Sequence, residues 1–230
     1  NVLSRFIMRH FAPVDIPLGL HWHPYASNVL PPILDLPELP REQGEHILVY
    51  LPFEDQAQVT AWLQQFPRQR FVQYASALER GQQGNVERHP TSISAFKANL
   101  AASRGVICNS GFELISECLQ WRKPVLTKPL AGQMEQLSNA LALSQLGYAR
   151  VIEGLCSDTL AQWLANTPGA PEVHFCKVHE VLARWLVAGC PCGPAELARS
   201  LWPSAPAAAH QPSLPTTPQA RIASAQSGVF

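Results

Sequence analysis

A small polar turn between a predicted strand and a predicted helix carries the residues best suited to chemistry. Ser110 and Gly111 form this turn, and the helix that follows begins with Phe112 and Glu113. The first backbone N–H groups of a helix have no partner within the helix, and the helix dipole is positive there, so such a turn suits a phosphate or a diphosphate. Gly111 allows a ligand to approach the backbone closely. Glu117 follows Glu113 by four residues, so both carboxylates lie on one helix face.

The same residues also have a structural interpretation. Ser110 and Glu113 have the spacing of a capping box, in which both side chains accept hydrogen bonds from backbone N–H groups at the start of a helix. We favour this capping role for Glu113 over a ligand contact. Glu117 lies deeper in the helix, so a ligand contact and a solvent-exposed position both stay open for it.

A second polar segment also leads from a predicted strand into a predicted helix. Gln133, Glu135, Gln136 and Asn139 supply closely spaced amide and carboxylate groups, which suit the hydroxyl groups of a sugar. An ordinary polar helix start is the alternative, and composition alone favours it.

Both segments must be held by strands and helices that alternate along the chain. Short apolar runs predict the strands, and apolar residues at helical spacing predict the helices between them. Such alternation indicates right-handed crossovers and a parallel sheet, with ligands at the carboxyl ends of the strands. We therefore predict one α/β domain with a doubly wound, parallel, Rossmann-like sheet. The expected strands are 46–53, 70–75, 105–108, 124–127 and 148–152, and the expected helices are 55–66, one opened by Thr91 or Ser92, 111–121, 134–146, 158–166 and 173–187.

Composition and charge exclude several classes of protein. Seventeen Lys and Arg balance seventeen Asp and Glu, so the chain as a whole is not attracted to nucleic acid. The sequence is 47% hydrophobic, which is enough for a core, but no apolar run approaches the roughly 20 residues of a transmembrane helix. The sequence contains neither the dinucleotide-binding G-x-G-x-x-G motif nor a P-loop motif.

The Cys and His residues do not form a metal-binding pattern. Cys190 and Cys192 are separated by one residue and have no second pair at zinc spacing. The scattered cysteines fit reduced thiols in a cytoplasmic protein. We expect neither His21 nor His23 to act in catalysis or to bind a metal ion, and we predict no metal site and no cofactor.

The two ends of the chain differ in composition from its middle. Seven prolines lie between residues 13 and 40, which predicts a connection between two domains, and we expect the first residues to belong to a helix of a longer protein. The last 28 residues, Pro203–Phe230, include five Pro, seven Ala and four Ser, which predicts a disordered tail or, alternatively, a flexible linker. The expected divisions are 1–40 for the connecting segment, 41–192 for the α/β domain and 193–230 for the tail.

Several short motifs follow one another in a fixed order between residues 106 and 154. They are Ser110-Gly111, Glu117, Lys123-Pro124, Pro129, Gln136 to Ala140 and Leu146-Gly147. This order resembles the donor-binding, C-terminal half of GT-B fold glycosyltransferases. The sequence is most similar to a bacterial and archaeal family with a GFELISE signature. It is more distantly similar to the N-acetylglucosamine transferases of the peptidoglycan lipid precursor and to the UDP-glucuronosyltransferases.

The resemblance implies a site for a nucleoside-diphosphate sugar, with UDP as the expected nucleotide. Glu117 corresponds to the acidic residue that holds the ribose hydroxyls. Ser110 and Gly111 correspond to the turn over the diphosphate, and Phe112 and Glu113 follow that turn.

The resemblance also implies contacts with the transferred sugar. Glu135 and Gln136 correspond to residues that face this sugar, and Gln133 and Asn139 lie near it. The nucleotide sugar is a substrate rather than a cofactor, and glycosyltransferases of this fold generally need no bound divalent metal. The base that deprotonates the acceptor usually comes from the acceptor-side domain, of which residues 1–40 would be the end.

The implied function is transfer of a hexose-like sugar to an unidentified acceptor, with this chain as the donor half. An acceptor-side domain or subunit is therefore an expected partner, and nucleic acid is not. The expected location is the cytoplasm, with peripheral binding at the inner membrane face as the alternative. Two other functions stay open: a non-catalytic nucleotide-sugar-binding subunit that needs a partner chain, and a nucleotide-sugar epimerase.

Overall fold

A mostly parallel sheet of seven strands forms the centre of the protein. The computed structural model describes residues 14–37, 44–166, 169 and 171–202. The strand order is β5-β6-β4-β3-β7-β8-β9, and only the pair of β5 and β6 is antiparallel. The predicted α/β class with a parallel sheet is therefore confirmed. The strands are β3 (Ile47–Tyr50), β4 (Phe71–Tyr74), β5 (Gly81–Gln83), β6 (Val86–His89), β7 (Gly105–Asn109), β8 (Val125–Lys128) and β9 (Arg150–Val151).

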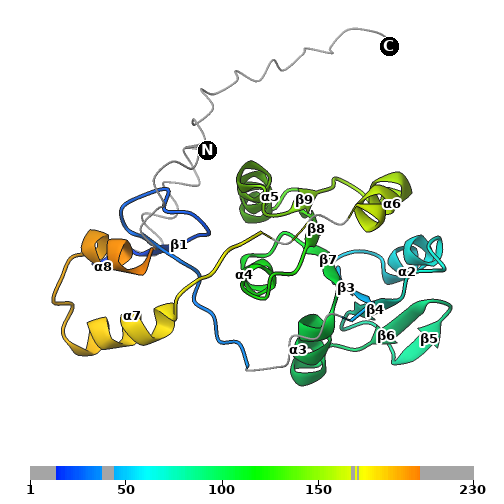
Figure 1. The fold of residues 1–230 in the computed structure, drawn as a ribbon, viewed down its shortest axis with the longest axis horizontal. Helices are drawn as coiled ribbons and strands as arrows, with labels where there is room; N and C mark the ends of the chain where they lie inside the picture. Colours follow the sequence, from blue (N-terminus) through cyan, green and yellow to red (C-terminus); the bar gives the residue numbers. More distant parts are fainter. Residues whose placement is uncertain (1–13, 38–43, 167–168, 170, 203–230) are drawn as a thin grey trace, which may run out of the picture.

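Helices cover both faces of this sheet (Figure 1). Leu48 belongs to a core with α3, α4 and α5, whereas its neighbours Ile47 and Val49 belong to a core with α2 and α6. This alternation follows from the two-residue period of a strand and requires apolar residues on both faces. Within the described ranges, no helix is both long and apolar enough to cross a membrane. The helices around the sheet are α2 (Gln56–Gln64), α3 (Ile93–Ala102), α4 (Phe112–Gln120), α5 (Met134–Leu146) and α6 (Ser157–Ala165).

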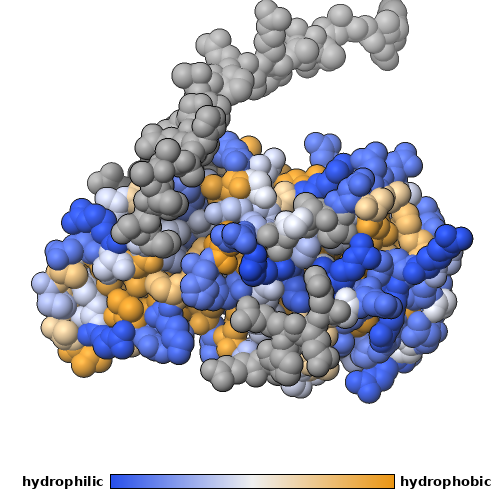
Figure 2. All heavy atoms as spheres, in the orientation of Figure 1, coloured by the Kyte–Doolittle hydropathy of each residue, from blue (hydrophilic) through white to orange (hydrophobic). Residues whose placement is uncertain are grey.

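A second, smaller unit combines segments from both ends of the described chain. Two short parallel strands pack with two helices, and the indole N–H of Trp202 donates a hydrogen bond of 2.7 Å to the Val29 carbonyl. Figure 2 shows hydrophobic residues at the surface of this unit, where Leu186 and Val187 are exposed. Its elements are β1 (Gly19–Leu20), β2 (Val29–Leu30), α7 (Val178–Val187) and α8 (Pro194–Leu201).

Helix α8 lies within the range predicted as a disordered tail, 193–230. Leu197, Ala198 and Leu201 share one helix face and are buried against α7 and β2. A proline in the first turn, where no backbone N–H is needed, starts this helix. The tail prediction therefore does not hold for residues 194–201, and residues 203–230 lie outside the described residues.

The hairpin of β5 and β6 is absent from the elements expected from the sequence. β5 has the sequence Gly-Gln-Gln, which gives no apolar signal for a strand. Gly84 turns the chain with φ of +60°, and the Asn85 side-chain amide donates to the carbonyls of Leu63, Phe66 and Gln69. The position of the hairpin therefore depends on contacts with the end of α2 and the turn after it, 16–22 positions earlier in the sequence.

Candidate functional site

The candidate site lies beside β3 and β7, two neighbouring strands from which the chain continues toward opposite edges of the sheet. From β3 the chain passes through α2 to β4, and from β7 it passes through α4 to β8 on the other side. The loops after β3 and β7 therefore diverge. Sheets of this kind bind ligands in the crevice that such a reversal opens at the carboxyl ends of the strands.

The N-terminus of α4 begins at this crevice without a side-chain cap. Gly111 is the N-cap residue, and within the described chain no side chain makes the capping hydrogen bond. A Cβ atom added to Gly111 would meet no other atom within 4 Å, so the space beside it is open. Unpaired N–H groups and the positive end of the helix dipole together favour an anion at this position.

The predicted capping box does not form, so the favoured interpretation of Glu113 was wrong. Ser110 is fully buried, and its Oγ lies in a hydrogen bond of 2.9 Å with Oγ1 of Thr127 on β8. Glu113 is exposed in the first turn of α4. The helix begins one residue later than a capping box requires, because Gly111 rather than Ser110 occupies the N-cap position.

Asn109, the last residue of β7, is buried just before this turn. Its Nδ2 donates a hydrogen bond of 3.0 Å to the Lys128 carbonyl, but its Oδ1 has no hydrogen-bond partner among the described residues. A buried oxygen without a donor is costly and unusual. Asn109 is not among the site residues expected from the sequence, although it stands directly at the strand end.

A cavity of about 280 Å³ lies between α3, α4 and the end of β3. Its walls combine aromatic and aliphatic side chains with two carboxylates and one ammonium group. Glu113 and Glu117 both line it, so the structure brings together the two acidic residues that the sequence placed on one helix face. The lining residues are Tyr50, Thr91, Ser92, Ile93, Phe96, Lys97, Glu113, Leu114 and Glu117.

Glu117 forms an ion pair with Lys97 within this wall. The two side chains are only 15% and 21% exposed. Burial raises the pKa of Glu117, the hydrogen bond and charge of Lys97 lower it, and the charge of Glu113 raises it. The solvent-exposed alternative for Glu117 is therefore wrong, because the carboxylate is largely buried and faces a cavity.

Gln136 and Asn139 join the two polar loops to each other. The Gln136 Oε1 accepts hydrogen bonds from the backbone N–H groups of Ser110 and Leu130, at 3.2 and 3.0 Å. The Asn139 Nδ2 donates to the Ser110 carbonyl at 3.0 Å. Both side chains are buried, so they hold the first loop against α5. The sequence suggested contacts with a sugar for these residues but could not reveal this bracing role.

Gln133 and Glu135 lie at the start of α5 and are exposed. Neither residue lines the cavity between α3 and α4. Gln133 is the N-cap residue of α5, but its side chain makes no capping hydrogen bond. Their predicted contacts with a ligand stay predictions.

A second ion pair crosses the carboxyl ends of the strands. The Lys128 Nζ lies 2.7 Å from the Glu54 Oε1, and the two side chains are 14% and 18% exposed. Lys128 ends β8 and Glu54 follows β3, so the pair reaches over β7, which lies between these strands. Neither residue is among the site residues expected from the sequence. The one signal is the position of Lys128, directly after the expected strand 124–127 and ahead of the second polar segment.

Phe112 packs against an aromatic residue that comes from far away in the sequence. Its ring stacks on Trp22 with centroids 4.9 Å apart, and the Trp22 indole N–H donates a hydrogen bond of 2.8 Å to Ser116. His21 lies beside them, and burial together with the charge of His23 lowers the pKa of His21. Phe112, a predicted site residue, therefore fixes α4 to the segment before β2.

Comparison with known families gave a match over residues 24–168 to the family described as glycosyl transferase family 1. No protein with a curated function matched the sequence.

Solved structures with a similar fold include two glycosyltransferases and ALG13. The glycotransferase of kitacinnamycin is 21% identical with a TM-score of 0.48, and the match covers 76% of this chain and 50% of that one. The glycosyltransferase SnogD from Streptomyces nogalater is 19% identical with a TM-score of 0.48, covering 86% and 60%. The solution structure of ALG13 is 12% identical with a TM-score of 0.41, covering 63% and 96%. The chain thus spans 50–60% of the length of the first two proteins.

Proposed function

Because the chain belongs to glycosyl transferase family 1, we propose that it binds a nucleoside-diphosphate sugar for transfer of the sugar to an acceptor. The proposed site is at the carboxyl ends of β3, β7 and β8, and UDP is the proposed nucleotide. The cavity between α3 and α4 supports this proposal most directly, because it is lined by a largely buried carboxylate of the same helix whose N-terminus lacks a side-chain cap.

In this proposal Glu117 binds the ribose. A carboxylate has two oxygens that accept hydrogen bonds, so it can hold two neighbouring hydroxyl groups. Lys97 supports this role because its positive charge favours the ionised form of Glu117 despite burial. The aromatic rings of Tyr50 and Phe96 in the same cavity offer apolar surface to the rest of the nucleoside.

The diphosphate would lie at the N-terminus of α4, beside Gly111. When the sugar leaves, negative charge develops on the diphosphate, and donors that are already in place stabilise this charge in the transition state. The N–H groups of the first turn can act in this way. Lys128 adds positive charge at the neighbouring strand end, where its backbone pairs with Asn109.

The sugar would face the second loop. Gln133 and Glu135 are exposed there and available for hydroxyl groups. Gln136 and Asn139 would act indirectly, because their side chains already form hydrogen bonds with the backbone of Ser110 and Leu130. They would keep the two loops at a fixed separation rather than touch the sugar.

A second candidate function is a nucleotide-sugar-binding subunit that relies on another chain for the acceptor. One observation favours it: all the donor-side groups described above come from the seven-stranded α/β unit. We therefore propose an acceptor-side domain or subunit as a partner. Transfer requires both reactants in one geometry, and correct positioning contributes about 7–11 kcal/mol of barrier lowering.

Titration of the purified 230-residue chain with UDP, GDP and TDP tests donor binding. We expect UDP to bind and to raise the melting temperature, because stabilisation by a ligand grows with the logarithm of its concentration divided by its Kd. No binding of any nucleoside diphosphate would overturn the proposal. Incubation with a radiolabelled UDP-sugar then separates the candidates: transfer to an added acceptor indicates the transferase, an epimeric sugar without acceptor indicates an epimerase, and binding without either product indicates the subunit.

A further inference from the structure

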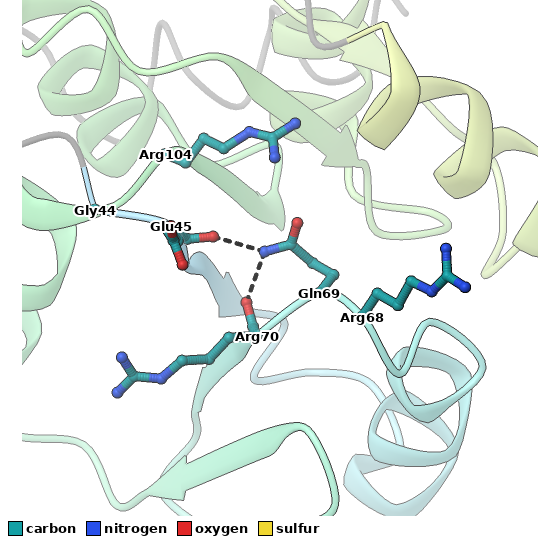
Figure 3. Close-up of a pocket in the computed structure, with 6 residues that line it drawn as sticks. All are labelled: Gly44, Glu45, Arg68, Gln69, Arg70 and Arg104. Carbon is teal, nitrogen blue, oxygen red and sulfur yellow. Dashed lines mark hydrogen bonds between the residues drawn. The ribbon is translucent and has the colours of Figure 1, made fainter.

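A second cavity, of about 560 Å³, lies at the end of the sheet opposite to the candidate donor site. It is formed where β3, β4 and β7 begin, whereas the donor site lies where strands end. Figure 3 shows its side chains, which come from three separate chain segments. The lining residues described are Gly44, Glu45, Arg68, Gln69, Arg70 and Arg104.

Positive charge is concentrated in this cavity. Three of the six lining residues are arginines and one is a glutamate, although the whole chain has a formal net charge of zero. Arg70 is paired with Glu87 at 2.6 Å, and Figure 3 shows its side chain extending away from the other two arginines. Arg68 and Arg104 project toward one side of the cavity, with the Gln69 side chain between them.

The backbone that carries these groups is held by hydrogen bonds. The Gln69 Nε2 donates to the carbonyls of Glu45 and Arg70, at 2.7 and 3.0 Å. The Arg104 backbone N–H donates to the His46 carbonyl at 2.8 Å, and its guanidinium donates to the Leu164 carbonyl at 2.9 Å. The cavity is therefore formed before any ligand binds, which reduces the entropy lost on binding.

The opposite wall is equally constrained. Gly44 donates its N–H to the Ala102 carbonyl at 2.7 Å, and a Cβ atom at position 44 would lie only 2.4 Å from that oxygen. Any other residue would therefore displace this wall. Close by, burial lowers the pKa of the His46 side chain, a hydrogen bond with the Asn99 carbonyl raises it, and the lowering charges of Arg70 and Lys123 are opposed by the charge of Glu87.

We propose that this cavity binds a phosphate group, as a free phosphate compound or as the headgroup of an anionic lipid. A guanidinium presents its N–H donors in a planar fork that matches two phosphate oxygens, and hydrogen bonds between charged partners are the strong ones. Arg68 and Arg104 supply this recognition. The Gln69 Oε1 can accept a hydrogen bond from a hydroxyl of the attached group. A cavity of about 560 Å³ has room for an organic group besides the phosphate.

The test is a titration of the isotope-labelled full chain, followed by NMR, with inorganic phosphate as the first probe. We expect saturable shifts of the backbone N–H signals of Gly44, Gln69 and Arg70. Vesicles of neutral lipid with and without phosphatidic acid form the second arm. Binding of phosphate alone identifies a soluble ligand, and binding of phosphatidic acid vesicles identifies a lipid headgroup.

Arg68→Glu is the informative variant, because Arg68 is exposed and has no described role in the fold. We expect it to weaken phosphate binding at this cavity at least tenfold. Arg199→Glu on α8 makes the same charge change outside the cavity and should leave binding unaltered. No shifts at the three N–H groups with either probe, or equal losses in both variants, would overturn the proposal. Nucleotide binding at the other end of the sheet does not enter this test.

Discussion

The Lys97 ammonium and the Glu117 carboxylate form an ion pair that connects α3 to α4 along the wall of one cavity. Burial alone favours the neutral acid, as the raised pKa of Glu117 shows, and Lys97 opposes that tendency. The pair therefore provides a charged acceptor in a largely apolar cavity. Its two members have different roles, and these can be separated by substitution.

Replacing Glu117 tests its contact with the nucleotide. Glu117→Ala should weaken UDP binding by about 1.5–3 kcal/mol, the range for hydrogen bonds to charged groups. Isothermal titration calorimetry measures the change, and circular dichroism establishes that the variant is folded. Glu196→Ala, which removes an exposed carboxylate of α8, serves as the matched control. Unaltered UDP affinity in the folded Glu117 variant would refute the assignment.

Replacing Lys97 tests the charge state of Glu117. Lys97→Met removes the positive charge that lowers the pKa of Glu117, so this pKa should rise further. As the pH falls, the variant should therefore lose the carboxylate form, and with it UDP affinity, at a higher pH than the wild type does. NMR titration of the Glu117 side-chain carbon in the free chain measures the pKa without interference from the nucleotide phosphates. A lower or identical pKa in the variant would contradict the prediction.

The strands and helices around the sheet were largely predictable from local patterns. Each of the five expected strands overlaps an observed one, although β7 and β8 end one residue later than expected, and α5 was predicted with the bounds that it has, Met134–Leu146. Asp55 caps α2 by accepting a hydrogen bond from the Gln58 N–H, a role for which Asp is among the preferred residues directly before a helix. Such features depend on neighbouring residues, so the sequence contains the necessary information.

Features that depend on distant contacts could not be predicted in this way. The burial of α8 depends on partners such as β2, and Trp202 reaches Val29 across 173 positions. The side-chain amide of Gln136 is chemically suited to bind a ligand. In the fold, however, it accepts hydrogen bonds from two loops and so holds them together. The pairing of Lys128 with Glu54 likewise required the strand order.

Substitution of Glu113 separates an electrostatic role from a capping role. Without a capping box, Glu113 stabilises α4 only through its charge near the helix N-terminus, which is worth about 0.3–1 kcal/mol. Glu113→Gln and Glu113→Ala should therefore reduce the free energy of unfolding equally, and high salt should diminish both losses. Urea denaturation without nucleotide measures them. A glutamine can complete a capping box, so a loss seen only in the alanine variant would restore that interpretation.

Substitution of Gln136 tests the bracing role. Gln136→Leu leaves the N–H groups of Ser110 and Leu130 without their acceptor, and each buried unsatisfied group costs about 1–3 kcal/mol. We expect a clear loss of stability in urea denaturation even without nucleotide. Gln133→Leu makes the same chemical change at an exposed position and should alter the free energy of unfolding by less than about 0.5 kcal/mol. Equal stability of the two variants would exclude a brace.

The ion pair of Lys128 and Glu54 is best tested by a double-mutant cycle. Lys128→Met and Glu54→Gln each leave a largely buried partner unpaired, whereas the double variant removes both groups, so the losses of stability should not add. We expect a coupling energy within about 0.5–3 kcal/mol, measured by urea denaturation.

The two residues differ in their effect on the ligand, because only Lys128 attracts a diphosphate. UDP affinity should therefore fall in Lys128→Met and should be maintained or increased in Glu54→Gln, where the lysine loses its competing carboxylate. Equal reductions of UDP affinity in both single variants would show that the pair acts only by holding the loops.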